Sequence, residues 1–478
     1  MNSIMAAVPL LTVVVGSLFL LILEVFLNRE NKSYLGYISL TFLVICGIIC
    51  TSFWNKDYSY FNGSLHLDNL SIFFYIISLL TIGFVILISL KYLFLQEANH
   101  GEFFALILFA LSGMMIMVSS TDLLIIFLGL ELLSISSYIL AGFRLKDVRS
   151  SESAIKYFLL GSFASAFLVF GMAFLFGISH STSLLAIVQH LQSGTSFKLI
   201  GFMGLGLVLA GFGFKIALAP FHMWAPDVYE GAPTPVTTFF SIGPKAAGFA
   251  VFLRFFHIYW HSLESSQAIF WLLWVIAVLT MIIGNLAALR QTNIKRILAY
   301  SSIAHGGYLM VAVLAQDYTS LMFYLVVYLF MNIGAFSAVI ALSKKNKEFL
   351  ELDDYSGIGF QYPWIGALFS VFLFSLAGFP PTGGFLAKFY VFSAAVRQGL
   401  VPLVIISVLT CLVSVFYYLR IIVYMYMKEP FHTVDVYKEN PALFLVMFLC
   451  VYEVFQLGIN PGSILVLIRQ ALISLPVF

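Results

Sequence analysis

Several ionisable side chains lie inside long apolar segments of this sequence, among them Glu131, Lys156, Lys215, Lys245 and Lys388. A charge at the centre of a bilayer costs about 2.5–3.5 kcal/mol even on a lenient insertion scale. Each of these groups must therefore be paired, hydrated or neutral for part of the time. A buried lysine can exchange a proton near neutral pH, whereas an arginine keeps its proton. A row of lysines beside a carboxylate therefore indicates proton translocation.

The acidic member of this row is Glu131, which lies in the middle of an apolar segment. Ser134 follows at a spacing that places both side chains on one face of a helix, so we expect its hydroxyl to serve the carboxylate. A carboxylate that moves toward or away from a lysine would change the pKa of that lysine. The alternative is a structural carboxyl that is simply held by hydrogen bonds.

Two of the lysines flank predicted helix breaks. Lys215 precedes Pro220, and Lys388 follows the run 378–384, which holds two prolines and three glycines. Backbone groups freed at a break can hydrate or bind a proton site; the alternative is a lysine that only satisfies free carbonyls. Lys245 follows Pro244 on the next predicted helix and suits a relay, although a structural role is also open.

Several further polar residues are less certain members of the site. His305 lies between Lys245 and Lys388 in the chain and can bridge them as a neutral relay; a packed, hydrogen-bonded histidine explains it equally well. Lys156 is about one turn inside its segment, so its ammonium can extend to the cytoplasm. His222, beside the first break, fits polar lining, and Glu453 fits contact with a neighbouring subunit.

The elements that must position these residues are membrane helices. The chain of 478 residues is 61% hydrophobic and only 10% charged, whereas soluble proteins carry about 25% charged residues. Fourteen apolar segments are each long enough to cross a bilayer as a helix. We predict the first to be a retained span and not a signal peptide. The predicted spans are 8–27, 34–54, 69–93, 102–119, 121–143, 152–178, 198–224, 233–257, 268–289, 293–315, 320–343, 361–396, 400–427 and 441–464.

The distribution of basic residues predicts the orientation of these spans. Odd-numbered loops hold fourteen of the 24 lysines and arginines, so we expect these loops to be cytoplasmic and both termini to face the other side. Five basic residues fall on the opposite side, and Arg420 sits near a helix end. Only Lys156, Lys215, Lys245 and Lys388 then remain within spans. The fourteen are Arg29, Lys32, Lys91, Arg144, Lys146, Arg149, Arg290, Lys295, Arg296, Lys344, Lys345, Lys347, Lys428 and Lys438; the five are Lys56, Lys198, Arg254, Arg397 and Arg469.

The order of the spans also suggests an internal repeat. After N-terminal helices 1–3 (1–101), we predict a five-helix block at 102–257, a second at 258–427, and a last helix within 428–478. The fourth helix of each block is interrupted by proline and glycine. Because five is odd, consecutive copies would enter the membrane from opposite sides, as in transporters with inverted repeats. The predicted fold is an all-α polytopic membrane protein of about 14 transmembrane helices with two inverted repeats.

The sequence offers no binding motif for a redox cofactor. No glycine-rich dinucleotide motif follows a predicted strand, and no Walker motif or haem ligand set is present. Cys46, Cys50, Cys411 and Cys450 lie in apolar runs without metal-ligand spacing. We therefore expect no cofactor and no metal on this chain, and the net charge of +2 does not favour nucleic acid.

Three stretches resemble a known family. Residues 213–235, which read GFKIALAPFHMWAPDVYEGAPTP, are similar to the antiporter-like subunits of respiratory NADH:quinone oxidoreductase (complex I). Residues 299–308 (AYSSIAHGGY) and 375–388 (SLAGFPPTGGFLAK) resemble the same family. Its siblings differ: subunit L is longer and ends in a lateral helix, and subunit M usually has glutamate where this chain has Lys388. Length, span number and that lysine are most similar to subunit N.

The resemblance implies a function for the buried row. The family's proton-channel residues correspond to Glu131, Lys215, Lys245 and Lys388, and Lys156 and His305 match commonly polar positions. It implies a place in the membrane arm of the complex, between the M and K subunits, and a location in the bacterial inner membrane. NADH, FMN, iron–sulfur clusters and quinone would be held by partner subunits. A subunit of a multi-subunit sodium/proton antiporter, or a non-conducting structural subunit of the membrane arm, remains an alternative.

Overall fold

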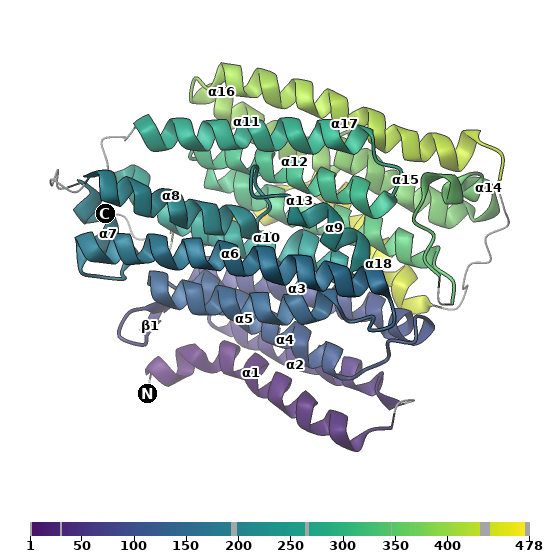
Figure 1. The fold of residues 1–478 in the computed structure, drawn as a ribbon, viewed down its shortest axis with the longest axis horizontal. Coiled ribbons are helices and arrows are strands. Elements are labelled where there is room, and N and C mark those ends of the chain that lie inside the picture. The colour runs from purple at the N-terminus through teal and green to yellow at the C-terminus, as the bar shows by residue number, and fades with distance from the viewer. Residues whose placement is uncertain are drawn as a thin grey trace.

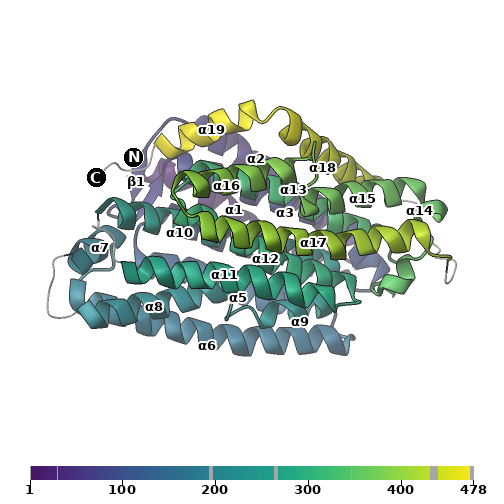
Figure 2. The ribbon, with the colours of Figure 1, turned by 90° about the horizontal axis from the view of Figure 1, so that it is seen from above.

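The computed structural model describes residues 2–28, 31–192, 198–262, 267–345, 347–430 and 440–473. Two of the basic residues assigned to cytoplasmic loops, Arg29 and Lys438, lie outside these ranges. The described chain is almost entirely helical, and its long helices run side by side (Figure 1). The start of α1 and the end of α19 lie at the same end of this bundle (Figures 1 and 2).

The first part of the chain forms six long helices and one short hairpin. The hairpin pairs two three-residue strands in antiparallel register, Tyr58 opposite Leu67, in a loop for which no strand was expected. The elements are α1 (Asn2–Phe26), α2 (Tyr34–Ser52), β1 (Tyr58–Tyr60), β2 (Leu65–Leu67), α3 (Asn69–Leu95), α4 (Glu102–Ser119), α5 (Leu123–Ala141) and α6 (Val148–Ser179).

The rest of the chain is helical and contains both predicted breaks. Its elements are α7 (Leu184–Gln192), α8 (Lys198–Lys215), α9 (Trp224–Gly231), α10 (Thr234–Ser262), α11 (Gln267–Leu289), α12 (Ile294–Leu314), α13 (Tyr318–Ala341), the 3-10 turn η2 (Leu352–Tyr355), α14 (Ile358–Gln361), α15 (Pro363–Ala377), α16 (Gly383–Arg397), α17 (Val401–Met427), α18 (Pro441–Ile459) and α19 (Gly462–Ile473). The short helix α7 was not expected from the sequence.

Short polar residues set where many of these helices begin. Asp68, Asp122, Asp147, Asn293 and Asp317 each precede a helix, and each side-chain oxygen accepts a backbone N–H of the first turn. Such caps satisfy donors that the helix itself cannot. They place the helix ends at the polar margins of the bundle, so the apolar lengths between them span it.

Twelve helices in the described part of the chain are long and apolar enough to cross a membrane. They coincide with twelve of the predicted spans. The other two predicted spans are each divided: α8 ends at Lys215 before α9 begins at Trp224, and α15 ends at Ala377 before α16 begins at Gly383. Among the twelve that coincide, the last predicted span (441–464) extends past the end of α18 at Ile459, because the helix is interrupted at Asn460 and Pro461 and α19 begins at Gly462.

Helices α10, α12 and α13 form the centre of the bundle. Figure 1 shows α1 and α2 toward one edge and α16 and α17 toward the opposite edge, with α10, α12 and α13 between them. Figure 2 shows α6 and α18 on opposite sides of the same three helices. The most apolar parts of α10, α12 and α13 are 94–100% buried, against 28–33% for α1, α6, α17 and α18. The outer helices turn apolar surface outward, as a bilayer requires, and the central helices can therefore hold polar groups away from lipid.

Candidate functional site

Four of the predicted site residues lie buried within the bundle. Lys215 ends α8, Lys245 and His305 come from the central helices α10 and α12, and Lys388 lies on α16; each is at most 6% exposed. A tyrosine ring lies 5.2–5.5 Å from the ammonium of each of the three lysines. A ring at this distance stabilises a cation without neutralising it.

Glu131 and Lys215 lie on neighbouring helices and use different hydroxyls. Ser165 of α6 donates to Glu131 Oε1 at 2.5 Å. The Lys215 ammonium donates to Ser134 Oγ at 2.9 Å and to the Tyr157 hydroxyl at 3.3 Å. The expected contact between Ser134 and Glu131 is therefore wrong: Ser134 accepts from Lys215 and donates to the Leu130 carbonyl. Helical spacing placed Ser134 correctly along α5, but a neighbouring helix supplied its partner.

A small cavity lies beside Lys215. It has a volume of about 10 Å³ and is lined by Ser134, Tyr138, Ser165 and Lys215. That volume is close to the minimum for one water molecule, about 10–15 Å³, and the lining offers the polar partners that such a water needs. The charge of Glu131 is close enough to act on Lys215. One water can thus connect the carboxylate's serine to the lysine.

Aromatic packing holds the Lys215 end of the site in place. The Tyr157 ring stacks on Trp224 of α9 at 4.4 Å, nearly parallel. Trp224 in turn donates its indole N–H to the Phe214 carbonyl at 2.9 Å, across the break that separates α8 from α9. The break and the aromatic stack together fix where Lys215 points.

Lys245 is held by one residue of the central helix α12. Its ammonium donates to the Ser302 hydroxyl at 2.6 Å and to the Ser302 carbonyl oxygen. Among the described residues, no carboxylate forms an ion pair with Lys245. A cation held only by neutral oxygens and an aromatic ring can lose its proton without leaving an unpaired carboxylate behind.

His305 lies one turn beyond Ser302 and joins two tyrosines. Its Nδ1 is 2.6 Å from the Tyr324 hydroxyl, and its Nε2 is 3.3 Å from the Tyr418 hydroxyl. The Tyr418 hydroxyl also contacts Ser301. Both Lys245 and Lys388 are close enough for their charges to act on His305. The imidazole is thus a polar link between the two lysines, as well as a packed histidine.

Lys388 binds the end of the helix that breaks before it. Its ammonium donates to the carbonyls of Leu376 and Ala377 at 2.8 and 2.9 Å. Gly378 follows them at a φ of 93°, a left-handed conformation that ends α15 and turns the chain. At Gly384 a Cβ would come within 1.8 Å of the Ser375 carbonyl oxygen, so only glycine permits this close approach. Carbonyls freed by the break therefore bind Lys388, a contact that both a proton site and a lysine that only satisfies free carbonyls would make. Lys215 uses side-chain hydroxyls instead.

Lys156 lies apart from the buried row. Its side chain is 41% exposed and forms 2.7 Å ion pairs with Glu152 and Asp227. Arg296 of α12 also pairs with Asp227 at 2.7 Å, so these charges form a surface network between α6, α9 and α12. The ammonium of Lys156 reaches the surface, as one of the two alternatives expected.

Three further titratable residues lie apart from the buried row. Glu24 is ion-paired with Lys32. His222 is buried beside the first break, and its Nδ1 has no partner among the described residues. Glu453 lines an apolar cavity on the outer face of α18.

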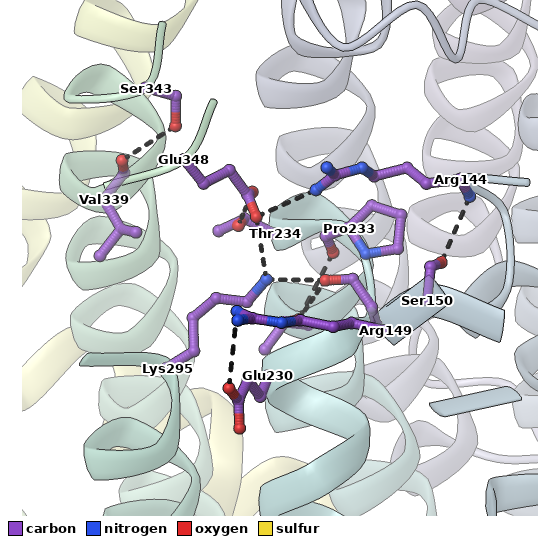
Figure 3. Close-up of polar contacts among 12 residues, drawn as sticks. Arg144, Arg149, Ser150, Glu230, Pro233, Thr234, Lys295, Val339, Ser343 and Glu348 are labelled. Atoms are coloured by element: carbon purple, nitrogen blue, oxygen red, sulfur yellow. Dashed lines mark hydrogen bonds and ion pairs between the residues drawn. The ribbon is translucent and has the colours of Figure 1, made fainter. Parts of the chain in front are cut away.

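A buried cluster around Glu348 was not expected from the sequence. Glu348 lies in the loop after α13 and accepts from the Tyr92 hydroxyl at 2.6 Å and from Thr234. Lys295 and Arg144 form ion pairs with it at 3.4 and 3.2 Å (Figure 3). Burial alone would raise the pKa of Glu348, but the two cations outweigh it and the pKa is lowered. The cluster joins five segments at one end of the bundle: α3, the loop after α5, the start of α10, the start of α12 and the loop after α13.

A second buried pair lies near the start of α3. Arg254 of α10 donates to Asp68 Oδ1 at 2.7 Å, to Ser71 Oγ at 2.8 Å and to the Val118 carbonyl at 2.7 Å. Burial would raise the pKa of Asp68, but the charge and hydrogen bond of Arg254 lower it.

These contacts correct the count of buried cations. Lys295 and Arg254, which the sequence placed in loops, are 0% and 3% exposed, whereas Lys156 is not buried. Position near a helix end does not reveal burial, because a loop can fold over it. The signal in the sequence was an acidic residue in another loop, Glu348 for Lys295 and Asp68 for Arg254, and neither acid is near its partner along the chain.

The sequence matches a known family over most of its length. Residues 120–414 match the family described as NADH:quinone oxidoreductase/Mrp antiporter, TM. NADH-quinone oxidoreductase subunit N of Trichlorobacter lovleyi is 46% identical, over 95% of this chain and 93% of the relative. Subunit N 1 of Solibacter usitatus is 42% identical over 95% and 93%.

Solved structures show the same fold. A chain of respiratory complex I from Thermus thermophilus superposes with a TM-score of 0.82 at 32% identity and covers 96% of this chain and 98% of its own length. A chain of the Mrp complex from Dietzia sp. DQ12-45-1b shares the fold alone, at 20% identity and a TM-score of 0.82 over 99% of this chain and 98% of its own. The chain therefore belongs to the NADH:quinone oxidoreductase/Mrp antiporter transmembrane family, among the subunit N proteins of NADH-quinone oxidoreductase.

Proposed function

We propose that this chain moves protons across the membrane as a membrane-arm subunit of NADH:quinone oxidoreductase, while partner subunits pass electrons from NADH to quinone. The observation that carries the proposal is the state of Lys245 and Lys388. Both are buried in a bundle of apolar, membrane-spanning helices, and both donate hydrogen bonds to neutral oxygens instead of carboxylates. Such lysines suit reversible protonation better than permanent ion pairing.

The proposed path runs along the buried row. Protons enter a cytoplasmic half-channel, load Lys215 and Lys245, pass the His305 region and reach Lys388, from which they leave on the outer side. The hydroxyl groups of Ser302, Tyr324 and Tyr418 support the middle of this path, since each lies within hydrogen-bonding distance of Lys245 or His305.

The proposed coupling acts through Glu131 and Lys215. A change in their separation alters the electrostatic hold on the Lys215 proton. The arrangement suits such a change, because Glu131 is bound to Ser165 and Lys215 to Ser134, and a small cavity is lined by both serines and by Lys215. Quinone reduction in partner subunits would drive that movement.

Several broader features belong to the same proposal. The subunit lies in the bacterial inner membrane beside the M and K subunits, with both termini on the outer side. NADH, FMN, iron–sulfur clusters and quinone are held by partners. The helices 102–257 and 258–427 act as two inverted repeats, supported by a break in each near a buried lysine. Together the two breaks would place one lysine in each half of the path.

The test is the reconstituted complex with Lys215→Ala or Glu131→Ala, measured for proton pumping and for NADH:quinone electron transfer. We expect pumping per electron to fall with either change. Lys428→Ala is the matched control, because Lys428 is 44% exposed and its carboxylate neighbour is 3.9 Å away. Full pumping with Lys215→Ala or Glu131→Ala would overturn the proposal.

A second candidate function is that of a subunit in a multi-subunit sodium/proton antiporter. It is favoured by the fold shared with the Mrp chain. Purification of the intact assembly separates the two: flavin and iron–sulfur proteins accompany the chain in the first case and are absent in the second.

A further inference from the structure

Tyr308 of α12 lies against Lys388, and its hydroxyl is bound by a helix outside the buried row. The Lys388 ammonium is 5.4 Å from the centre of the Tyr308 ring, and Tyr308 is 1% exposed. Asn285 of α11 donates from its amide nitrogen to the Tyr308 hydroxyl at 3.1 Å. The Asn285 amide oxygen accepts from the Tyr417 hydroxyl of α17, also at 3.1 Å. This fully buried amide therefore joins α11, α12 and α17 beside Lys388, although the proton path proposed above does not include it.

Close packing of α11 on α12 fixes where Asn285 lies. A Cβ at Gly284 would come within 2.6 Å of a backbone nitrogen of α12, and a Cβ at Gly307 within 2.9 Å of a backbone nitrogen of α11. At these glycines the two backbones approach closely, as at glycine contacts between membrane helices. Asn285 follows Gly284, and Tyr308 follows Gly307. The glycine contact therefore sets the two side chains in register with each other.

The ammonium of Lys388 has few groups around it that favour its charged form. It donates to the carbonyls of Leu376 and Ala377, and among the described residues no carboxylate forms an ion pair with it. The face of an aromatic ring attracts a cation, and the attraction is stronger where water is excluded. The Tyr308 ring can therefore change the proton affinity of Lys388, provided that its face stays beside the ammonium.

The titratable groups on the neighbouring helices do not replace this ring. On α12 and α17, the His305 imidazole and the Cys411 thiol are close enough to interact with the ammonium. A charged imidazole would repel the ammonium, and a thiol is neutral at its ordinary pKa. Helix α15 carries no titratable side chain. The titratable groups of α13 and α18 have other neighbours: Tyr324 and Tyr328 contact His305, and Glu453 lines the cavity on the outer face of α18.

We infer that Tyr308 raises the proton affinity of Lys388 through the face of its ring, and that Asn285 is the positioning residue that holds the ring there. The hydrogen bond fixes the far end of the tyrosine, so the ring does not swing away from the ammonium. Phe392 and His305 contact the ring nearly at right angles, at 5.9 and 5.7 Å, and limit its rotation. The inference rests on the proposed function, because this affinity matters only if Lys388 exchanges a proton.

The test is the pH dependence of the protons pumped per electron in the reconstituted complex. Tyr308→Leu removes the ring and makes the charged ammonium less stable, so the alkaline limit of pumping should move to lower pH by about one unit. Asn285→Leu and Tyr308→Phe break the same hydrogen bond from its two ends. Both should move the limit in the same direction by a smaller and similar amount, and the double variant should move it no further.

Tyr318→Phe is the matched control and should keep the wild-type pH profile. Tyr318 is also buried, with its ring 5.7 Å from that of His257, but its hydroxyl has no hydrogen-bond partner in the described part of the chain. The yield of intact complex and its electron transfer are measured for every variant. If Tyr308→Leu does not assemble, the pair Asn285→Leu and Tyr308→Phe decides.

A structural role and a role in proton affinity give different results. An equal fall in pumping at every pH, with the alkaline limit unchanged in Asn285→Leu and Tyr308→Phe, overturns the inference. So does a shift in Tyr318→Phe as large as theirs. Full pumping by Lys215→Ala would instead overturn the proposed function itself, so the two failures are distinguishable.

Discussion

The ammonium of Lys215 donates to Ser134 Oγ at 2.9 Å, from a different helix and 81 residues away. Ser134 therefore forms a hydrogen bond with Lys215 and not with Glu131, which lies on the same helix, α5. This contact makes Ser134 a part of the Lys215 site that can be tested separately.

Ser134→Ala should reduce proton pumping in the reconstituted complex. A hydrogen bond to a charged group contributes about 1.5–3 kcal/mol, so its loss shifts the protonation of Lys215 measurably. The control is Ser136→Ala on the same helix, whose hydroxyl donates only to the Leu132 carbonyl. Equal pumping by the two variants would show that Ser134 plays no part.

Lys388→Arg and Lys388→Met should both abolish most of the pumping. The guanidinium keeps the positive charge beside the Leu376 and Ala377 carbonyls but does not release its proton. Pumping measured with a pH-sensitive dye in vesicles distinguishes a Lys388 that releases its proton from a Lys388 that serves only as a fixed charge. If Lys388→Arg pumps as the wild type does, the residue serves only as a fixed charge.

Lys156→Met should have a small effect on both assembly and pumping. Its side chain is 41% exposed and its ion pairs lie at the surface, where such pairs contribute about 0–1 kcal/mol. Pumping is compared with that of Lys215→Ala in the same preparation. A loss as large as that of Lys215→Ala would place Lys156 in the path.

Glu348→Gln should destabilise the subunit by about 3–5 kcal/mol at neutral pH, because Lys295 would remain buried without its counter-charge. The folded-state pKa of Glu348 lies below its usual value, so its stabilisation is complete above about pH 4.5 and is lost as the pH falls through the folded pKa. Thermal unfolding in detergent, followed against pH, should show this acid dependence in the wild type and a weaker one in the variant.

The control for that measurement is Asp353→Asn in the same loop region. Its side chain is 73% exposed and its cationic neighbour is 3.9 Å away, so stability should barely change. An acid dependence that is the same in the wild type and in Glu348→Gln would rule out the assigned role.

Arg254→Met and Asp68→Asn should each destabilise the subunit strongly, since each leaves a buried partner unpaired. The double variant should lose less than the two single losses combined, because neither unpaired charge remains. A double-mutant cycle of thermal unfolding measures the coupling. Strict additivity would mean that the 2.7 Å contact contributes nothing of its own.

Much of this fold could be predicted from the sequence, because the bilayer imposes a simple rule. Every span must bury its backbone in a helix of sufficient apolar length, and such lengths are visible in the order of residues. The same rule exposes misplaced charge, so Glu131, Lys215, Lys245 and Lys388 could be singled out. Proline and glycine likewise predicted both helix breaks, since they remove a donor or permit a reversed φ.

Only the tertiary structure decided which residues form contacts with one another. Spacing along α5 shows which side chains share a face of that helix. It does not show that Lys215, on a different helix, donates a hydrogen bond to Ser134. The buried Lys295 and Arg254 were predicted to be in loops, because burial near a helix end depends on what folds over it. The sequence therefore determined which groups are costly in a membrane. Packing of α10, α12 and α13 decided which of them are buried, and the contacts made by those buried groups come from distant parts of the chain.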